Sequence, residues 1–180
     1  MTSLTSPYQA SAATVSPYLA QKSQDTEDEV VIANMDFFPD LHLLDFQLSY
    51  RVDASQHQNR QEQALQEAMV TVNNELLNNN ATDSGINWVC EQVRKGYFTL
   101  SAVPSVIYGE VTDKQKQYLS AVYAHAKSLL VDRYPELFFG RKDRSAKSDP
   151  DNNTGDIYLT ESRVNIRQLM GKARMTVDLI

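Results

Sequence analysis

The fold class is indicated most clearly by residues 65–76, which read LQEAMVTVNNEL. The apolar residues in this stretch recur every three or four positions, as on one face of an α-helix: Leu65, Ala68, Met69, Val72 and Leu76. Asn78-Asn79-Asn80 follows, and asparagine tolerates the left-handed conformation in which helices end. The stretch therefore predicts an amphipathic helix that packs one face into a core.

The same spacing continues on both sides of this helix. Before it, the pattern predicts a helix over 41–52 with an apolar face of Leu41, Leu44, Leu48 and Val52, and Asp40 can cap it. After it, a short helix is expected to start at Asp83 or Ser84, to close at Gly96, and to carry Ile86, Val89 and Val93. The segment from Tyr97 to Pro104 is expected to be connecting chain.

Two longer helices are predicted in the second half of the chain. Thr112 and Gln115 match a capping box, which opens a helix that stops at Tyr134-Pro135. Its apolar stripe is Leu119, Val122, Ala126, Leu129 and Leu130. The last helix is expected from about Thr154 to Val177, with Leu159, Ile166, Met170, Ala173 and Val177 on one face.

No convincing alternating strand pair appears, so we predict an all-α fold. It is a small helical bundle of four to five helices with a flexible N-terminal arm and an extended C-terminal helix. Residues 1–29 are rich in Ser, Thr, Ala and Gln, and hold too little apolar surface to offset the entropy of ordering. We therefore expect a flexible arm over 1–29, in which Tyr8 and Tyr18 can anchor on a partner, and a helical domain over 30–180.

The composition narrows the function classes. A chain of 180 residues supplies one domain with a real core, and its net charge of −6 argues against nonspecific wrapping of nucleic acid. One cysteine, Cys90, excludes an intrachain disulfide and a cysteine-based zinc site. The N-terminus lacks the basic and apolar regions of a secretory signal, and no apolar run is long enough for a membrane helix. We expect an intracellular soluble protein.

Catalytic chemistry is not indicated. His42, His57 and His125 form no metal-binding motif, and no phosphate-binding or dinucleotide-binding loop or nucleophile elbow occurs. Cys90 reads as a small buried residue, and His125 as a histidine at the boundary of the core with a polar partner. We predict no catalytic residue, no metal and no cofactor. A small enzyme that uses His125 or Cys90 is the last-ranked hypothesis.

Positive charge is concentrated in one place, at Arg141, Lys142, Arg144 and Lys147. This cluster can hold an acidic partner or DNA phosphates, or it can be a solvated loop after a helix C-terminus, where cations are favoured. It lacks interleaved aromatic residues, so it is weak evidence for sequence-specific DNA binding.

Five motifs in order resemble one family, the head completion proteins (gpL type) of temperate contractile-tailed phages of the Peduovirus kind. The first three are Phe37-Phe38-Pro39-Asp40, Asn73-Asn74-Glu75-Leu76 and the connector from Gly96 to Pro104. The fourth is the pattern in the long helix: Tyr118, Ala121-Val122, Ala124, Ala126, Ser128-Leu129 and Arg133-Tyr134. The fifth is Asp143 with Ser145-Ala146-Lys147. The resemblance covers roughly residues 30–177.

The resemblance implies a structural, non-enzymatic virion protein, made in the host cytoplasm and placed at the portal vertex between head and tail. Such adaptors form a closed ring beneath the portal after packaging, twelve-fold to match the portal. They prolong the channel for the packaged DNA and offer a surface to a tail terminator or other neck proteins. The C-terminal cations, Arg163 and Arg167 included, are the expected portal or DNA contact. The alternative is a DNA-binding or packaging accessory protein that acts through residues 141–147.

Overall fold

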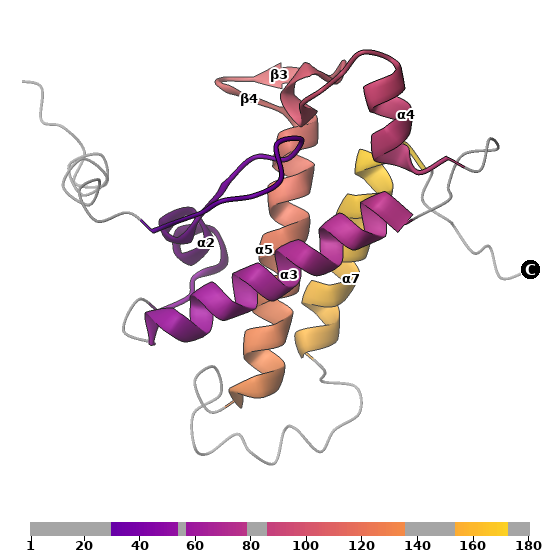
Figure 1. Ribbon diagram of the computed structural model, residues 1–180. Coiled ribbons are helices and arrows are strands. Elements are labelled where there is room, and N and C mark those ends of the chain that lie inside the picture. Colours follow the sequence, from indigo (N-terminus) through magenta and orange to yellow (C-terminus); the bar gives the residue numbers. More distant parts are fainter. Residues whose placement is uncertain (1–29, 54–56, 79–85, 136–153, 173–180) are drawn as a thin grey trace, which may run out of the picture.

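The structure is a computed structural model that describes residues 30–53, 57–78, 86–135 and 154–172. Figure 1 shows a helical body arranged around one long helix, α5 (Asp113–Arg133). The other helices of the described residues are α2 (Leu43–Tyr50), α3 (Gln58–Asn78), α4 (Trp88–Arg94) and α7 (Thr154–Leu169). The predicted helical class is thus confirmed in its main feature.

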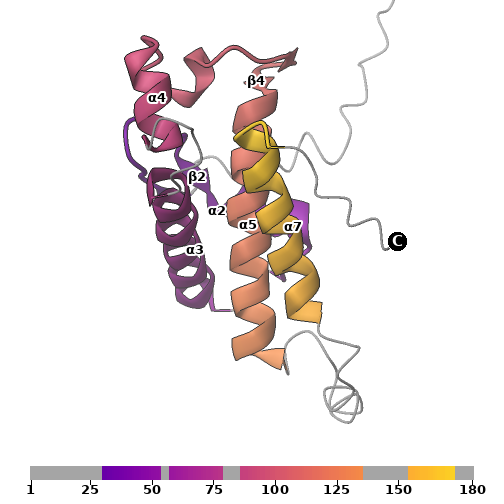
Figure 2. The ribbon, with the colours of Figure 1, turned by 90° about the vertical axis from the view of Figure 1, so that its right-hand side faces the viewer.

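Helix α5 is the centre of the body. Figure 2 shows α3 on one side of α5 and α7 on another, with α7 running antiparallel to α5. The predicted capping box is confirmed: Oγ1 of Thr112 accepts the amide of Gln115 at 3.2 Å, and Oε1 of Gln115 accepts the amide of Thr112 at 3.0 Å. Of the predicted stripe, Val122, Ala126 and Leu130 are buried, while Leu119 and Leu129 are only partly buried. Because neighbours cover α5 on more than one side, the buried surface also includes Tyr118, Ala121, Tyr123, Ala124 and Val131.

Helix α3 contains the stretch that indicated the fold. Leu65, Ala68, Val72 and Leu76 are buried, as their spacing predicts, whereas Met69 is only partly buried against the core. Two polar residues on the same helix, Gln61 and Asn73, are also buried. Helical spacing thus identified the inward face but not its polar members.

The expectation that the chain has no strands is wrong. β1 (Val31–Ile32) pairs antiparallel with β2 (Leu41–His42), and β3 (Ile107–Tyr108) pairs antiparallel with β4 (Val111–Thr112). Gly109, with φ of +71°, takes the first position of the two-residue turn between β3 and β4, a place that favours glycine. Two residues are too few to show an alternating pattern, which is why the sequence did not indicate these strands.

The helix predicted over 41–52 is shorter than expected. Leu41 belongs to β2, and α2 ends at Tyr50 because Arg51 adopts the left-handed conformation with φ of +48°. The inward residues of α2 are Leu43 and Phe46, while Leu48 is exposed. The inward face of α2 therefore differs from the predicted one, because burial is set by which elements pack against the helix.

Helix α4 starts later than predicted. Its N-cap is Asn87, whose Oδ1 accepts the amide of Cys90 at 2.7 Å; Asp83 and Ser84 lie outside the described residues. Its buried residues are Trp88, Val89 and Gln92, and Val93 is exposed. The expected connecting chain after α4 contains a short 3-10 helix, η2 (Leu100–Ala102), which buries Leu100.

Helix α7 ends before the predicted position. Met170 and Gly171 form a turn after Leu169, and Gly171 has φ of +73°. The amide of Lys172 donates to the carbonyl of Arg167 and that of Gly171 to the carbonyl of Gln168, both at 2.9 Å, which is a Schellman motif. The prediction that the helix continues past Leu169 is thus wrong for residues 170–172. Ala173 and Val177 lie outside the described residues.

Candidate interaction surface

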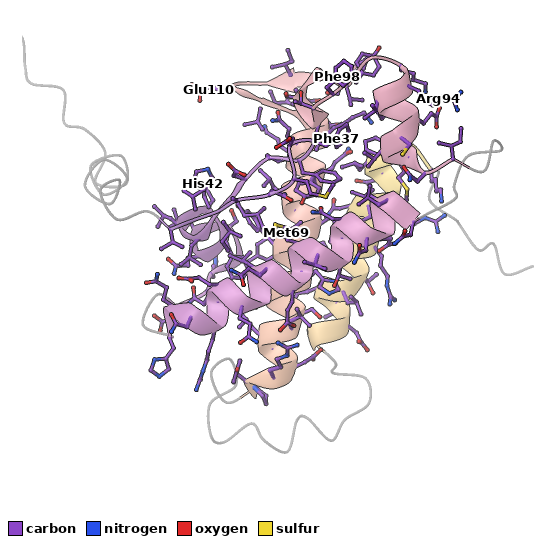
Figure 3. All side chains as sticks on the ribbon, in the orientation of Figure 1. Phe37, His42, Met69, Arg94, Phe98 and Glu110 are labelled. Carbon is purple, nitrogen blue, oxygen red and sulfur yellow. The ribbon has the colours of Figure 1, made fainter. Side chains whose placement is uncertain are left out.

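The first family-like motif lies in the core rather than on a surface. Phe38 stacks on Tyr118 with ring centroids 4.6 Å apart, and Phe37 meets Trp88 edge-on at 6.1 Å. Figure 3 shows Phe37 on the β1–β2 loop close to the upper half of α5. The two phenylalanines therefore fasten this loop to α5 and α4.

Pro39 and Asp40 close the same loop through two hydrogen bonds to Asn34, each between a backbone group and a side chain. The carbonyl of Pro39 accepts from Nδ2 of Asn34, and Oδ1 of Asp40 accepts from the amide of Asn34, each at 2.9 Å. Asp40 does not cap the following helix, because β2 intervenes and the N-cap of α2 is His42, whose side chain makes no cap bond. The predicted cap is thus a loop-closing residue.

The prediction that Gly96 ends the preceding helix, α4, is confirmed. Its amide donates to the carbonyl of Val93 at 2.9 Å, and the amide of Tyr97 donates to that of Gln92 at 3.0 Å. With φ of +92°, Gly96 occupies a conformation that other residues adopt only with strain. Pro104 follows the buried Val103 and is itself exposed.

The predicted cationic site is only partly described. Arg141, Lys142, Arg144 and Lys147 lie outside the described residues. Arg163 is exposed on α7, and Arg167 on the same helix is partly buried and engaged with a neighbouring group. The two α7 cations are thus placed, while their joining with the 141–147 cluster into one surface stays a prediction.

The end of α7 is fastened to α5 and α4 through one lysine. Nζ of Lys114 donates to the carbonyl of Leu169 at 3.0 Å and lies 5.7 Å from the ring centroid of Trp88. Burial lowers the pKa of Lys114 below its ordinary value. A cation at the last carbonyl of a helix interacts favourably with the negative end of the helix dipole. Lys114 therefore holds the C-terminal end of α7 at the end of the molecule where α4 lies.

That end of the molecule also carries exposed apolar side chains. Their exposed fractions are Phe98 70%, Ile107 68%, Val106 60%, Tyr108 55% and Val93 38%. We call these five residues the apical apolar surface. Figure 3 shows these residues spread across this end: Glu110 by the β3–β4 hairpin on one side, Arg94 on α4 on the other, and Phe98 between them. Several large apolar side chains exposed at one end of a soluble protein indicate an interaction site there.

Cations border the apical apolar surface. Arg94 is exposed, Lys95 forms an ion pair with Glu91 at 2.6 Å, and Nζ of Lys116 lies 5.1 Å from the ring centroid of Tyr108. This surface was not predicted from the sequence. The run Val106-Ile107-Tyr108 just before Gly109 was the available signal, but a short apolar run is also what a buried strand shows.

The residues considered for catalysis are scattered. His57 is exposed, and His42 occupies the N-cap position of α2 without a side-chain cap bond. His125 is half-buried on α5, and its pKa is lowered first by burial and then by the charge of Arg163. Cys90 is exposed, which corrects its expected burial: it lies on the outer side of the short helix α4.

Among the described residues, no group of three or more His, Cys, Asp or Glu side chains can hold a metal ion. No described helix combines the length and apolar character needed to cross a membrane. What the described residues do present is a packed helical body with an exposed apolar surface at one end, which is typical of a protein that works by binding other proteins.

The comparison with known families gives this class a specific identity. The chain matches the family described as "Phage head completion protein (GPL)" over residues 32–180, and it belongs to that family. The resemblance inferred from the five motifs is thereby confirmed; the narrower Peduovirus kind stays a prediction. The family is a structural one, not an enzyme family, and its members serve in the virion near the junction of head and tail. No curated protein and no solved structure gave a significant match.

Proposed function

We propose that the protein assembles after DNA packaging as a closed ring beneath the portal, extends the DNA channel, and provides the surface to which the tail or neck proteins attach. The apical apolar surface is the observation that carries this proposal. A protein that works alone gains nothing from exposing Phe98, Ile107 and Tyr108 at one end, whereas a subunit of an assembly buries such residues against its neighbours.

A closed ring needs a heterologous contact, in which one surface of each subunit meets a different surface of the next. The net charge of −6 supports a role around DNA that must pass through, because a strongly basic lining would hold phosphates. For the portal contact we propose the C-terminal cations Arg141, Lys142, Arg144, Lys147, Arg163 and Arg167, which complement an acidic rim.

The proposal is tested by mixing the full chain with purified portal and sedimenting the mixture at low and high salt. The wild type is expected to co-sediment, with binding that falls as salt rises. The double variant Arg141→Glu with Arg144→Glu is expected to bind less, while Arg51→Glu, a charge reversal at the exposed end of α2, serves as the matched control.

Electron microscopy of the sedimented material is expected to show one ring on the portal. Salt-dependent binding of duplex DNA by the monomer, without portal binding, would instead favour the packaging-accessory hypothesis and overturn the proposed ring. If the double variant co-sediments like the wild type at both salts, Arg141 and Arg144 lie outside the portal interface.

A further inference from the structure

The apical apolar surface has a composition suited to an extended proline-containing segment. Phe98 and Tyr108 are aromatic, Val106 and Ile107 are aliphatic, and all four are more than half exposed. Recognition of extended proline-rich segments relies on exposed aromatic side chains, against which proline rings and neighbouring side chains pack. Such segments bind at low entropic cost because proline already restricts their backbone.

The chain itself contains such a segment. Residues 1–29 hold Ser6-Pro7-Tyr8 and Ser16-Pro17-Tyr18, two copies of one tripeptide. In each copy the proline favours an extended backbone and the tyrosine supplies an aromatic anchor. The remaining residues of 1–29 are mostly small and polar, so the two tyrosines are its main candidates for burial on a surface.

The reach and charge of residues 1–29 also suit this site. At ~3.3 Å per residue the segment spans up to about 95 Å, which is enough to cross from one compact subunit onto the next. It joins the described body at Val30, and just before that point it carries Asp25, Glu27, Asp28 and Glu29. At the apical apolar surface Arg94 and Lys116 are of the opposite sign, while Lys95 is already paired with Glu91 and Glu110 adds one negative charge.

We infer that residues 1–29 of one copy bind the apical apolar surface of a neighbouring copy, with Tyr8 and Tyr18 as anchors. This inference rests on the proposed ring, because it supplies one contact between adjacent subunits. The inference also gives residues 1–29 a binding role, although they hold too little apolar surface to fold alone: their tyrosines meet a partner surface only after assembly.

The test titrates a fluorescent peptide of residues 1–29 with the full chain, at a concentration at which the chain is monomeric, and follows fluorescence anisotropy. Binding is expected, and it should weaken as salt rises because of the acidic residues. Ile107→Ser is expected to weaken it at least about tenfold. The matched control is Ile157→Ser on α7: Ile157 is 66% exposed against 68% for Ile107, so both changes remove the same exposed side chain at different places.

The second variant changes the peptide, so it cannot affect the folding of the full chain. A peptide with Tyr8→Ser and Tyr18→Ser is expected to lose binding to the wild-type chain. Absence of binding by the wild-type peptide would overturn the inference. Equal weakening by Ile107→Ser and Ile157→Ser would do the same, since the site would then not be the apical apolar surface.

The failure of this inference is distinguishable from failure of the proposed function. If rings form on the portal but the peptide does not bind, the inference is wrong and the ring stands; the apical apolar surface is then covered by the folded body of a neighbour or by another protein. If the full chain never binds portal, the proposed function fails by a measurement in which the peptide plays no part.

Discussion

The phenol hydroxyl of Tyr118 donates a 2.7 Å hydrogen bond to Oδ1 of Asn73, and both side chains are buried. Asn34 closes the set: its Nδ2 donates to the hydroxyl of Tyr118 at 2.7 Å, and its Oδ1 accepts from Nδ2 of Asn73 at 2.9 Å. These three side chains come from α5, α3 and the loop after β1. A network in which each member donates to the next links three parts of the chain that lie far apart in sequence.

Removing the hydroxyl from this network should destabilise the fold. Tyr118→Phe leaves buried polar atoms of Asn73 and Asn34 without that partner, so the free energy of unfolding should fall by about 1–3 kcal/mol. Urea denaturation measures the change. The matched control is Tyr108→Phe, which removes a hydroxyl from an exposed tyrosine and should change stability by less than about 0.5 kcal/mol. Equal effects of the two variants would show that the network adds nothing.

Leu65 and Met69 lie one turn apart on α3 but differ in burial. Leu65 is fully buried and Met69 only partly, so Leu65→Ala should cost about 2–5 kcal/mol and Met69→Ala clearly less. The sequence pattern alone treats both as core residues. Urea denaturation of the two variants distinguishes these views, and equal losses would place Met69 as deep in the core as Leu65.

The buried lysine of α5 should make stability depend on pH. Lys127 is 5% exposed, and burial lowers its pKa to about 8. Between that pH and ~10.4, the ordinary lysine pKa, the unfolded chain binds a proton that the folded chain has lost, so stability should rise with pH. Lys127→Met should reduce this rise, and the lowered pKa of Lys114 should leave a smaller rise of the same sign.

The measurement is the free energy of unfolding in urea at about pH 7 and about pH 9, where an unfolded tyrosine with a pKa of ~10 is only about one tenth ionised. Lys116→Met, a change of an exposed lysine, is the matched control and should keep the wild-type dependence. If wild-type stability is flat or falls across this range, the lysine is not held neutral by its surroundings.

Gly171 should be needed to end α7. Its φ is +73°, and a Cβ added there meets no atom within 4 Å, so the cost of Gly171→Ala comes from the backbone alone. We expect a loss of about 1 kcal/mol, and a smaller loss for Gly171→Asn, since asparagine tolerates this conformation better. Thermal or urea unfolding of the two variants compares them. An alanine variant as stable as the wild type would contradict the required left-handed turn.

Residues 1–29 should contribute to assembly and not to folding. A chain that starts at Val30 should keep the thermal midpoint of the full chain, because the core residues described here begin with Ile32. Its binding to portal or to further copies should weaken. A markedly lower midpoint would place part of residues 1–29 in the folded domain and would move the proposed boundary at residue 30.

Local patterns in the sequence were enough for the helices that organise the body. Two examples are the apolar face over residues 65–76 and the capping box of Thr112 and Gln115. Each depends only on residues a few positions apart, so each can be predicted without knowledge of the rest of the fold. The role of Gly96 can be predicted for the same reason, because it ends the helix that lies directly before it. The family, too, was recognisable from short motifs in order.

The tertiary structure decided what depends on distant partners. Asn73 reads as polar and outward until Tyr118 and Asn34 are brought beside it, and Asp40 reads as a helix cap until β2 is seen to intervene. Phe98, Ile107 and Tyr108 carry no sign in the sequence of whether they are buried, and the described body leaves them exposed. The reason is physical: side-chain spacing records which residues share one face of an element, whereas burial depends on which other elements pack against that face.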